Sequence, residues 1–96
     1  MRKLYAMATA VACLIGATAA NAEQPTLTLG VLEDYSGLYA DATGEGSTVA
    51  TRMAIEDSGL LAKGWKIKVI TADHLNKPDV GVNIARKWID EDKVDA

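Results

Sequence analysis

Two segments with apolar residues at every second position are each followed by a segment with helical periodicity. The alternating positions are Leu27, Leu29 and Val31 in residues 26–32, and Trp65, Ile67, Val69 and Thr71 in residues 65–71. Such alternation predicts two β-strands. Leu32 adds bulk to the other side of the first strand, which suits a central parallel strand covered by helices. Lys66 and Lys68 make one side of the second strand partly polar, which suits the edge of a sheet.

The first predicted strand leads, through a long loop, into a predicted helix. Its apolar residues recur at spacings of three and four and form one face, made of Val49, Ala50, Met53 and Ala54. Ser47 or its neighbour can cap the start with a hydroxyl, and Gly59 suits a left-handed helix end. We therefore predict a helix from Ser47 to Ser58.

The second predicted strand leads into a strongly amphipathic helix. Pro78 fits its first position, where the missing N–H costs nothing. After it, Val80, Ile84 and Trp88 share one line, with Gly81, Ala85 and Ile89 beside them. Gly81 is small enough to let the helix approach a sheet closely. The last four residues, "KVDA", would start a third strand.

This order predicts an α/β fold with a parallel sheet, βαβα connectivity and right-handed crossovers. In such sheets, ligands bind in the loops at the carboxyl ends of the strands. Residues 33–46 and 72–77 are the two loops of this kind, so they are the candidate ligand-binding loops.

The first 22 residues have the layout of a secretory signal peptide. Arg2 and Lys3 precede an uncharged run over residues 4–20, and Ala20-Asn21-Ala22 is a small-x-small triplet. Cleavage is expected after Ala22. The alternative is a retained transmembrane anchor, for which this Ala-rich run is short.

The chain has one cysteine, Cys13, inside the predicted signal peptide. Lipidation of Cys13 is an alternative, but Ala10, three positions before it, is not the large aliphatic residue expected before a lipoprotein cysteine. The mature chain then has no disulfide, which suits a larger periplasmic protein better than a small stapled domain.

Cleavage would leave 13 acidic and eight basic residues, a formal net charge of −5. This balance argues against nucleic-acid or anionic-membrane partners, because neutralising phosphates requires clustered Lys and Arg. The 74 residues of the mature chain are few for a stable core without disulfides. We therefore expect residues 23–96 to be the N-terminal part of a longer protein, the alternative being a complete small domain.

A nucleotide site is disfavoured by the glycine pattern. Gly44-Glu45-Gly46 lacks the third glycine of the dinucleotide motif, because position 49 is Val49. Asp73 lies 27 positions after Gly46, too far for the ribose-binding acid, and no P-loop sequence is present.

Catalytic and metal sites have equally weak support. Ser36, Asp34 and His74 supply the residue types of a hydrolytic triad, but no serine lies in a Gly-x-Ser-x-Gly elbow. Asp73 and His74 are adjacent, yet no further pair of ligands stands at a metal-binding spacing. We predict no catalysis, no metal and no cofactor.

Tyr35 and Tyr39 lie in the first candidate loop and can line a small-molecule pocket with apolar rings and hydroxyl groups. Ser36, Gly37 and the amides of residues 44–47 can donate to a ligand carboxylate, which a helix N-terminus favours. The alternative is that Tyr39 packs on the first helix and the glycines only shape the turn.

The same residues resemble a known family along the whole mature chain. The resembling motifs are GVL, SG-x-YAD, G-x-GS, A-x-EDSG, ADH-x-NKPD and ARKWIDED-x-VDA, in this order. Together they look like the start of periplasmic substrate-binding proteins of ABC transporters, of the branched-chain amino acid type with the type I periplasmic-binding fold.

The resemblance implies a two-lobed, monomeric protein that closes on a small solute and delivers it to a membrane permease and its ATPase. Residues 23–96 would be the first half of the Rossmann-like N-terminal lobe. The implied ligand-binding residues are Ser36, Tyr39, Ala40 and Asp41 in the first loop, and Asp73 and His74 in the second.

The expected function is therefore a periplasmic solute-binding component of an ABC importer. Its solute would be a branched-chain amino acid, an aromatic acid or a related organic compound. The alternatives are the ligand-sensing domain of a receptor with the same fold and an exported α/β enzyme.

Overall fold

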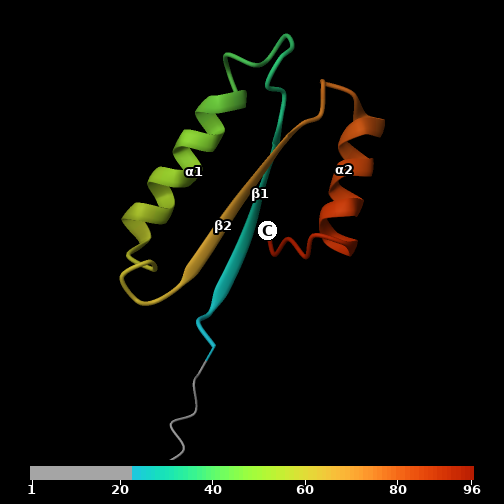
Figure 1. The fold of residues 1–96 in the computed structure, drawn as a ribbon. Coiled ribbons are helices and arrows are strands. Elements are labelled where there is room, and N and C mark those ends of the chain that lie inside the picture. Colours follow the sequence, from blue (N-terminus) through green and yellow to red (C-terminus); the bar gives the residue numbers. More distant parts are fainter. Residues whose placement is uncertain (1–22) are drawn as a thin grey trace, which may run out of the picture.

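The structure, a computed structural model, describes residues 23–96; the predicted signal peptide lies outside this part. Strands β1 (Thr26–Glu33) and β2 (Lys66–Asp73) form a parallel sheet, and helices α1 (Gly44–Ser58) and α2 (Pro78–Asp90) follow them in turn (Figure 1). The predicted α/β fold and its βαβα order are confirmed. No helix of this part combines the length and apolar character needed to cross a membrane.

The register of the sheet brings the two candidate loops to one edge. Thr26 pairs with Lys66 at the start of the strands, and Glu33 pairs with Asp73 at their end. The ladder continues one step further, because the amide of His74 donates to the carbonyl of Glu33 at 3.0 Å. Both loops therefore leave the sheet at the same level.

The C-terminal residues lie along the other edge of β1. The amide of Gly30 donates to the carbonyl of Ala96 at 2.8 Å, and the amide of Asp95 donates to the carbonyl of Thr28 at 2.9 Å. Successive residues of a strand direct their backbone groups to alternate edges. The carbonyls of Pro25 and Glu33 accept hydrogen bonds from the amides at the two ends of β2, so β2 lies on the edge opposite to the one that Thr28 and Gly30 use. The described sheet has two strands, and residues 93–96 form no strand in it. Their backbone hydrogen bonds with β1 lie where the predicted third strand would start.

Helix α1 begins earlier than predicted. It starts at Gly44, three residues before Ser47, and the preceding Thr43 makes no side-chain capping hydrogen bond. Gly44 has a φ of +41°, so the start depends on the backbone freedom of glycine rather than on a serine cap. The predicted end is confirmed, because Gly59 has a left-handed φ of 71°.

The predicted apolar face of α1 is wrong. Val49 and Met53 are 48% and 58% exposed. The residues of this helix with lower exposure are Gly44, Ser47, Thr48, Thr51 and Ile55. Apolar residues occur on more than one side of α1, so their spacing does not single out the side that packs. Gly44 and Thr48 are the buried residues of this helix, and both contact the loop that follows β1.

The two helices cover opposite faces of the sheet (Figure 1). Leu27 and Leu29 of β1 share an apolar hollow with α1, while Gly30 and Leu32 share one with α2. This follows from the pleat, because alternate residues of a strand point to opposite faces. Among residues 23–96, Val31 is the one apolar side chain that is buried, at 8% exposure.

Helix α2 packs on β1 through Trp88 and Gly30. A Cβ atom placed on Gly30 would lie 2.5 Å from Cζ3 of Trp88, so the indole fits only because position 30 has no side chain. Pro78 is the first residue of the helix, as predicted. The close approach expected at Gly81 is instead at Gly30, since a Cβ on Gly81 would meet only ordinary contact with His74 at 3.5 Å.

Candidate functional site

The loop between β1 and α1 folds around a buried carboxylate. Asp34 is 1% exposed and is the most deeply buried side chain of residues 23–96. Its Oδ1 accepts a hydrogen bond from the amide of Gly37 at 2.7 Å, and its Oδ2 accepts one from the amide of Tyr39 at 3.0 Å. The backbone of this loop therefore turns around the Asp34 carboxylate, which accepts hydrogen bonds from two of its amides.

A second contact attaches this loop to α1. The hydroxyl of Tyr35 lies 2.6 Å from Oγ1 of Thr48, and Thr48 is buried. Tyr35 is thus hydrogen-bonded to the helix and is only partly exposed. One hydrogen-bonding position of this hydroxyl is therefore taken by Thr48, and a ligand would have to use the remaining ones.

A third contact joins the loop to the other candidate loop. The hydroxyl of Ser36 donates to Oδ2 of Asp73 at 2.6 Å, and the amide of Leu75 donates to Oδ1 at 2.8 Å. The Ser36 hydrogen bond, followed by that of Leu75, holds the pKa of the Asp73 carboxyl below its ordinary value. Two of the predicted site residues, one from each loop, are therefore brought together.

The remaining predicted residues of the first loop form its outer turn. The carbonyl of Tyr39 accepts from the amides of Ala42 and Thr43 at 2.9 and 3.0 Å. The Tyr39 side chain is half-exposed. Ala40 is partly shielded and Asp41 is exposed. Leu38, which the sequence did not single out, is 82% exposed beside Tyr39.

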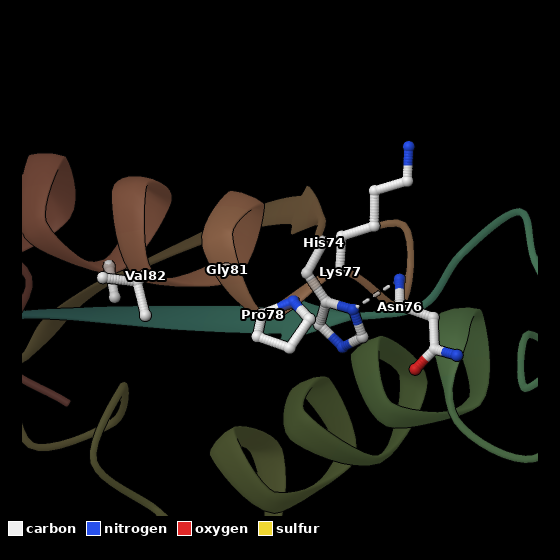
Figure 2. Close-up of a pocket in the computed structure, with 7 residues that line it drawn as sticks. His74, Asn76, Lys77, Pro78, Gly81 and Val82 are labelled. Atoms are coloured by element: carbon white, nitrogen blue, oxygen red, sulfur yellow. Dashed lines mark hydrogen bonds between the residues drawn. The ribbon is translucent and has the colours of Figure 1, made fainter.

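His74 lies in a tight turn after β2. Its Nδ1 accepts a hydrogen bond from the amide of Asn76 at 2.9 Å, which leaves the proton of a neutral ring on Nε2. Leu75 and Asn76 have left-handed φ values of 56° and 53°. His74 borders an open groove of about 450 Å³ on α2 (Figure 2), lined also by Lys77, Pro78, Gly81, Val82 and others.

The hydrogen bonds disfavour a hydrolytic triad. Ser36 donates to Asp73 and not to an imidazole, and the Asp34 carboxylate is occupied by two backbone amides. Within residues 23–96, no group of three or more His, Cys, Asp and Glu side chains is placed to hold a metal ion. The arrangement offers hydrogen-bonding groups and a tyrosine ring rather than a nucleophile and a base.

Sequence reasoning missed two residues that shape this site. The sequence pattern indicates Asp34 only as a member of a hydrolytic triad, and it does not single out Thr48. An aspartate that precedes a glycine by three positions is a signal for a side chain that bonds to turn amides. Nothing in the sequence marks Thr48 as the partner of Tyr35, because their pairing depends on how α1 lies on the sheet.

Comparison with known proteins adds independent information. A family model described as "Periplasmic binding protein" matches residues 26–96. No significant match was found among curated protein sequences. A solved structure of a branched chain amino acid ABC transporter periplasmic ligand-binding protein from Burkholderia xenovorans LB400 is 51% identical, with a TM-score of 0.67 over 72% of this chain. A periplasmic binding protein from Burkholderia mallei is 40% identical, with a TM-score of 0.65 over the same share.

The matched regions make up 18% of each of these two solved chains. The sequence resemblance, the fold and the family model therefore agree. The chain belongs to the periplasmic binding protein family.

Proposed function

We propose that this chain is part of the solute-binding component of an ABC importer, which captures a small organic solute by closure of two lobes. The observation that carries the proposal is the Ser36–Asp73 hydrogen bond of 2.6 Å. It unites the two loops at the carboxyl edge of the sheet, where ligands bind in folds of this kind. Family membership and the name of the Burkholderia xenovorans relative support the transport role.

We also propose a domain organisation for the chain. Residues 1–22 act as a cleaved signal peptide, and residues 23–96 form the N-terminal part of the first lobe. The 18% share of the two solved chains supports a first-lobe segment rather than a whole binding protein. A periplasmic location agrees with the family and with the predicted signal peptide.

The proposed ligand contacts on this lobe are Ser36, Tyr39, Ala40, Asp41, Asp73 and His74. The Ser36 hydroxyl gives its proton to Asp73, so it offers a ligand its remaining acceptor capacity. Tyr39 offers an aromatic face and a hydroxyl, and His74 offers a proton on Nε2. This combination fits a solute with both an apolar part and a polar head, such as a branched-chain amino acid or an aromatic acid.

The proposed partners are the membrane permease and ATPase of the transporter, and the protein itself performs no chemical step. Specificity then comes from differences in affinity, and transport is driven by the partners after the lobes close. The full-length protein acts as a monomer in this proposal.

A ligand screen of the complete protein tests the proposal. Branched-chain amino acids, aromatic acids and their amides are added singly, and the unfolding temperature is recorded. A true ligand at a hundredfold excess over its Kd stabilises the fold by about 2.7 kcal/mol. Failure of every compound at millimolar concentration would contradict the proposed solute class.

Variants then locate the site. Tyr39→Ala removes a half-exposed ring of the first loop, and Met53→Ala removes an exposed side chain from the outer side of α1. We expect the first to weaken binding and the second to leave it unchanged. Equal affinity for the two variants would place the solute elsewhere.

A further inference from the structure

We infer that Asp34 is a positioning residue, which fixes the conformation of the loop 35–43 before any solute binds. As a statement about ligand binding, this inference rests on the proposed function. The structural basis of the inference does not depend on the proposed function. It is the burial of the Asp34 carboxylate and the hydrogen bonds that this carboxylate accepts from two backbone amides.

Asp34 is an unusual residue to find at 1% exposure. A buried carboxylate is normally paired with a cation, because the loss of hydration is costly. Within residues 23–96 the one ion pair is Lys87–Asp92 on α2, so no described cation balances Asp34. The amides of Gly37 and Tyr39 take the place of lost water, one on each carboxylate oxygen.

The two amides belong to residues on either side of Leu38. Holding both of them inward directs the residue between them outward, and Leu38 is the most exposed large apolar side chain of the described chain. Tyr39 leaves the same turn half-exposed. Asp34 therefore sets which side chains the loop presents to solvent, although Asp34 itself is out of reach of a solute.

Two glycines close around Asp34 and show that the fit is tight. A Cβ atom on Gly37 would lie 2.7 Å from Oδ2 and 2.8 Å from Oδ1 of Asp34. A Cβ atom on Gly44 would lie 3.1 Å from the carbonyl oxygen of Asp34, and Gly44 also has a left-handed φ of +41°. The carboxylate thus occupies the space that a side chain at position 37 would need.

The consequence for binding is preorganisation. A loop that is already ordered loses less conformational entropy when a solute binds. Asp34 therefore raises the affinity for the solute without contacting it. Removing the carboxylate should release the loop and weaken solute binding, while the sheet and the two helices, which Asp34 does not hold together, stay folded.

Amide hydrogen exchange of the complete protein tests the inference directly. In the Asp34→Ala variant we expect the amides of Gly37 and Tyr39 to exchange on the order of tenfold faster or more, since each loses a charge-assisted hydrogen bond. Asp34→Asn has one acceptor oxygen instead of two, so it should protect only one of these amides. Asp57→Asn, the same change at an exposed position of α1, should alter neither.

A double-variant cycle tests the packing argument. Gly37→Ala alone should lower the unfolding temperature, because the methyl group meets the carboxylate. In the Asp34→Ala background the same change should have a smaller effect, since the opposing oxygens are gone. Equal effects in both backgrounds, or unchanged exchange at Gly37 and Tyr39 in Asp34→Ala, would overturn the inference.

Binding provides the functional readout, with L-leucine and benzoate as probes. If the parent protein binds either probe, Asp34→Ala should lower the affinity for that probe about tenfold or more, as expected from the loss of interactions with a charged group. Asp34→Asn should recover part of this affinity. Unchanged affinity would overturn the positioning role. Absence of binding by the parent protein would count against the proposed solute class, and the exchange data would still decide whether Asp34 holds the loop.

Discussion

The hydroxyl of Ser36 and the carboxylate of Asp73 form a 2.6 Å hydrogen bond between residues 37 positions apart in the sequence. The parallel register makes this bond possible, because it pairs Glu33 with Asp73 and so ends both strands at one level. The two candidate loops, residues 33–46 and 72–77, are therefore joined at one edge of the sheet.

Ser36→Ala should uncouple the two loops. We expect a small loss in the free energy of unfolding of the complete protein, because this hydrogen bond is exposed to solvent, and weaker binding of any solute found in the screen. Denaturant unfolding and calorimetric titration measure the two effects. Ser36→Thr keeps the hydroxyl and serves as the control; a loss as large as that of the alanine variant would point to packing instead of the hydrogen bond.

The same bond predicts a pH dependence of stability. The folded-state pKa of Asp73 is lowered from 3.8, first by Ser36 and then by Leu75. A lowered pKa means that the ionised form is favoured by folding, so the stabilisation is present above pH 3.8 and is lost as the pH falls through the folded value. Unfolding curves between neutral pH and about pH 2 measure it.

Ser36→Ala should reduce this acid sensitivity, because the largest cause of the shift is removed. Asp73→Asn should abolish the contribution of this group altogether. If both variants retain the pH profile of the parent protein, Asp73 is not the titrating group.

Gly30→Ala should separate α2 from the sheet. The added methyl group would lie 2.5 Å from Cζ3 of Trp88, and forcing extra volume into a packed contact costs about 1–3 kcal/mol. Thermal or denaturant unfolding of the complete protein measures this cost.

Gly46→Ala is the matched control, because nothing lies within 4 Å of a Cβ atom at that position of α1. Alanine is the better helix former, so this variant should keep or raise stability. Replacing Trp88 by leucine in the Gly30→Ala background should recover part of the loss. A Gly30→Ala variant as stable as the parent would contradict the close contact.

Residues 23–96 expressed alone should not unfold cooperatively. Val31 is the one buried apolar side chain of this part, and a cooperative transition requires a larger buried core. Circular dichroism on heating should show a broad, gradual change, and a hydrophobic dye should bind at low temperature. A sharp transition with coincident probes would refute this expectation.

The elements with clear periodicity were predictable from the sequence. Both strands, the order βαβα and helix α2 with Pro78 at its first position follow from local patterns that the structure retains. The family was recognisable for a related reason, since its motifs extend over most of residues 23–96 and their order is informative even where each one is weak.

The orientation of α1 was not predictable, and the site details depend on it. Its outer side carries Val49 and Met53, and its inner side carries Thr48, so hydrophobicity alone selects the wrong face. The Tyr35–Thr48 bond is a consequence of that orientation. The role of Asp34 likewise depends on a backbone turn that brings two amides to one carboxylate, which residue spacing indicates only in outline.

The contact between Gly30 and Trp88 also gives the molecule an optical reporter. The chain has two tryptophans; Trp65 precedes β2, and the Trp88 indole lies against the middle of β1. Indole emission depends on the polarity around the ring, so a Trp65→Phe variant would report the docking of α2 from this part of the chain without a label. Because Gly30 lies away from the loop edge of the sheet, that signal would follow helix packing rather than solute occupancy.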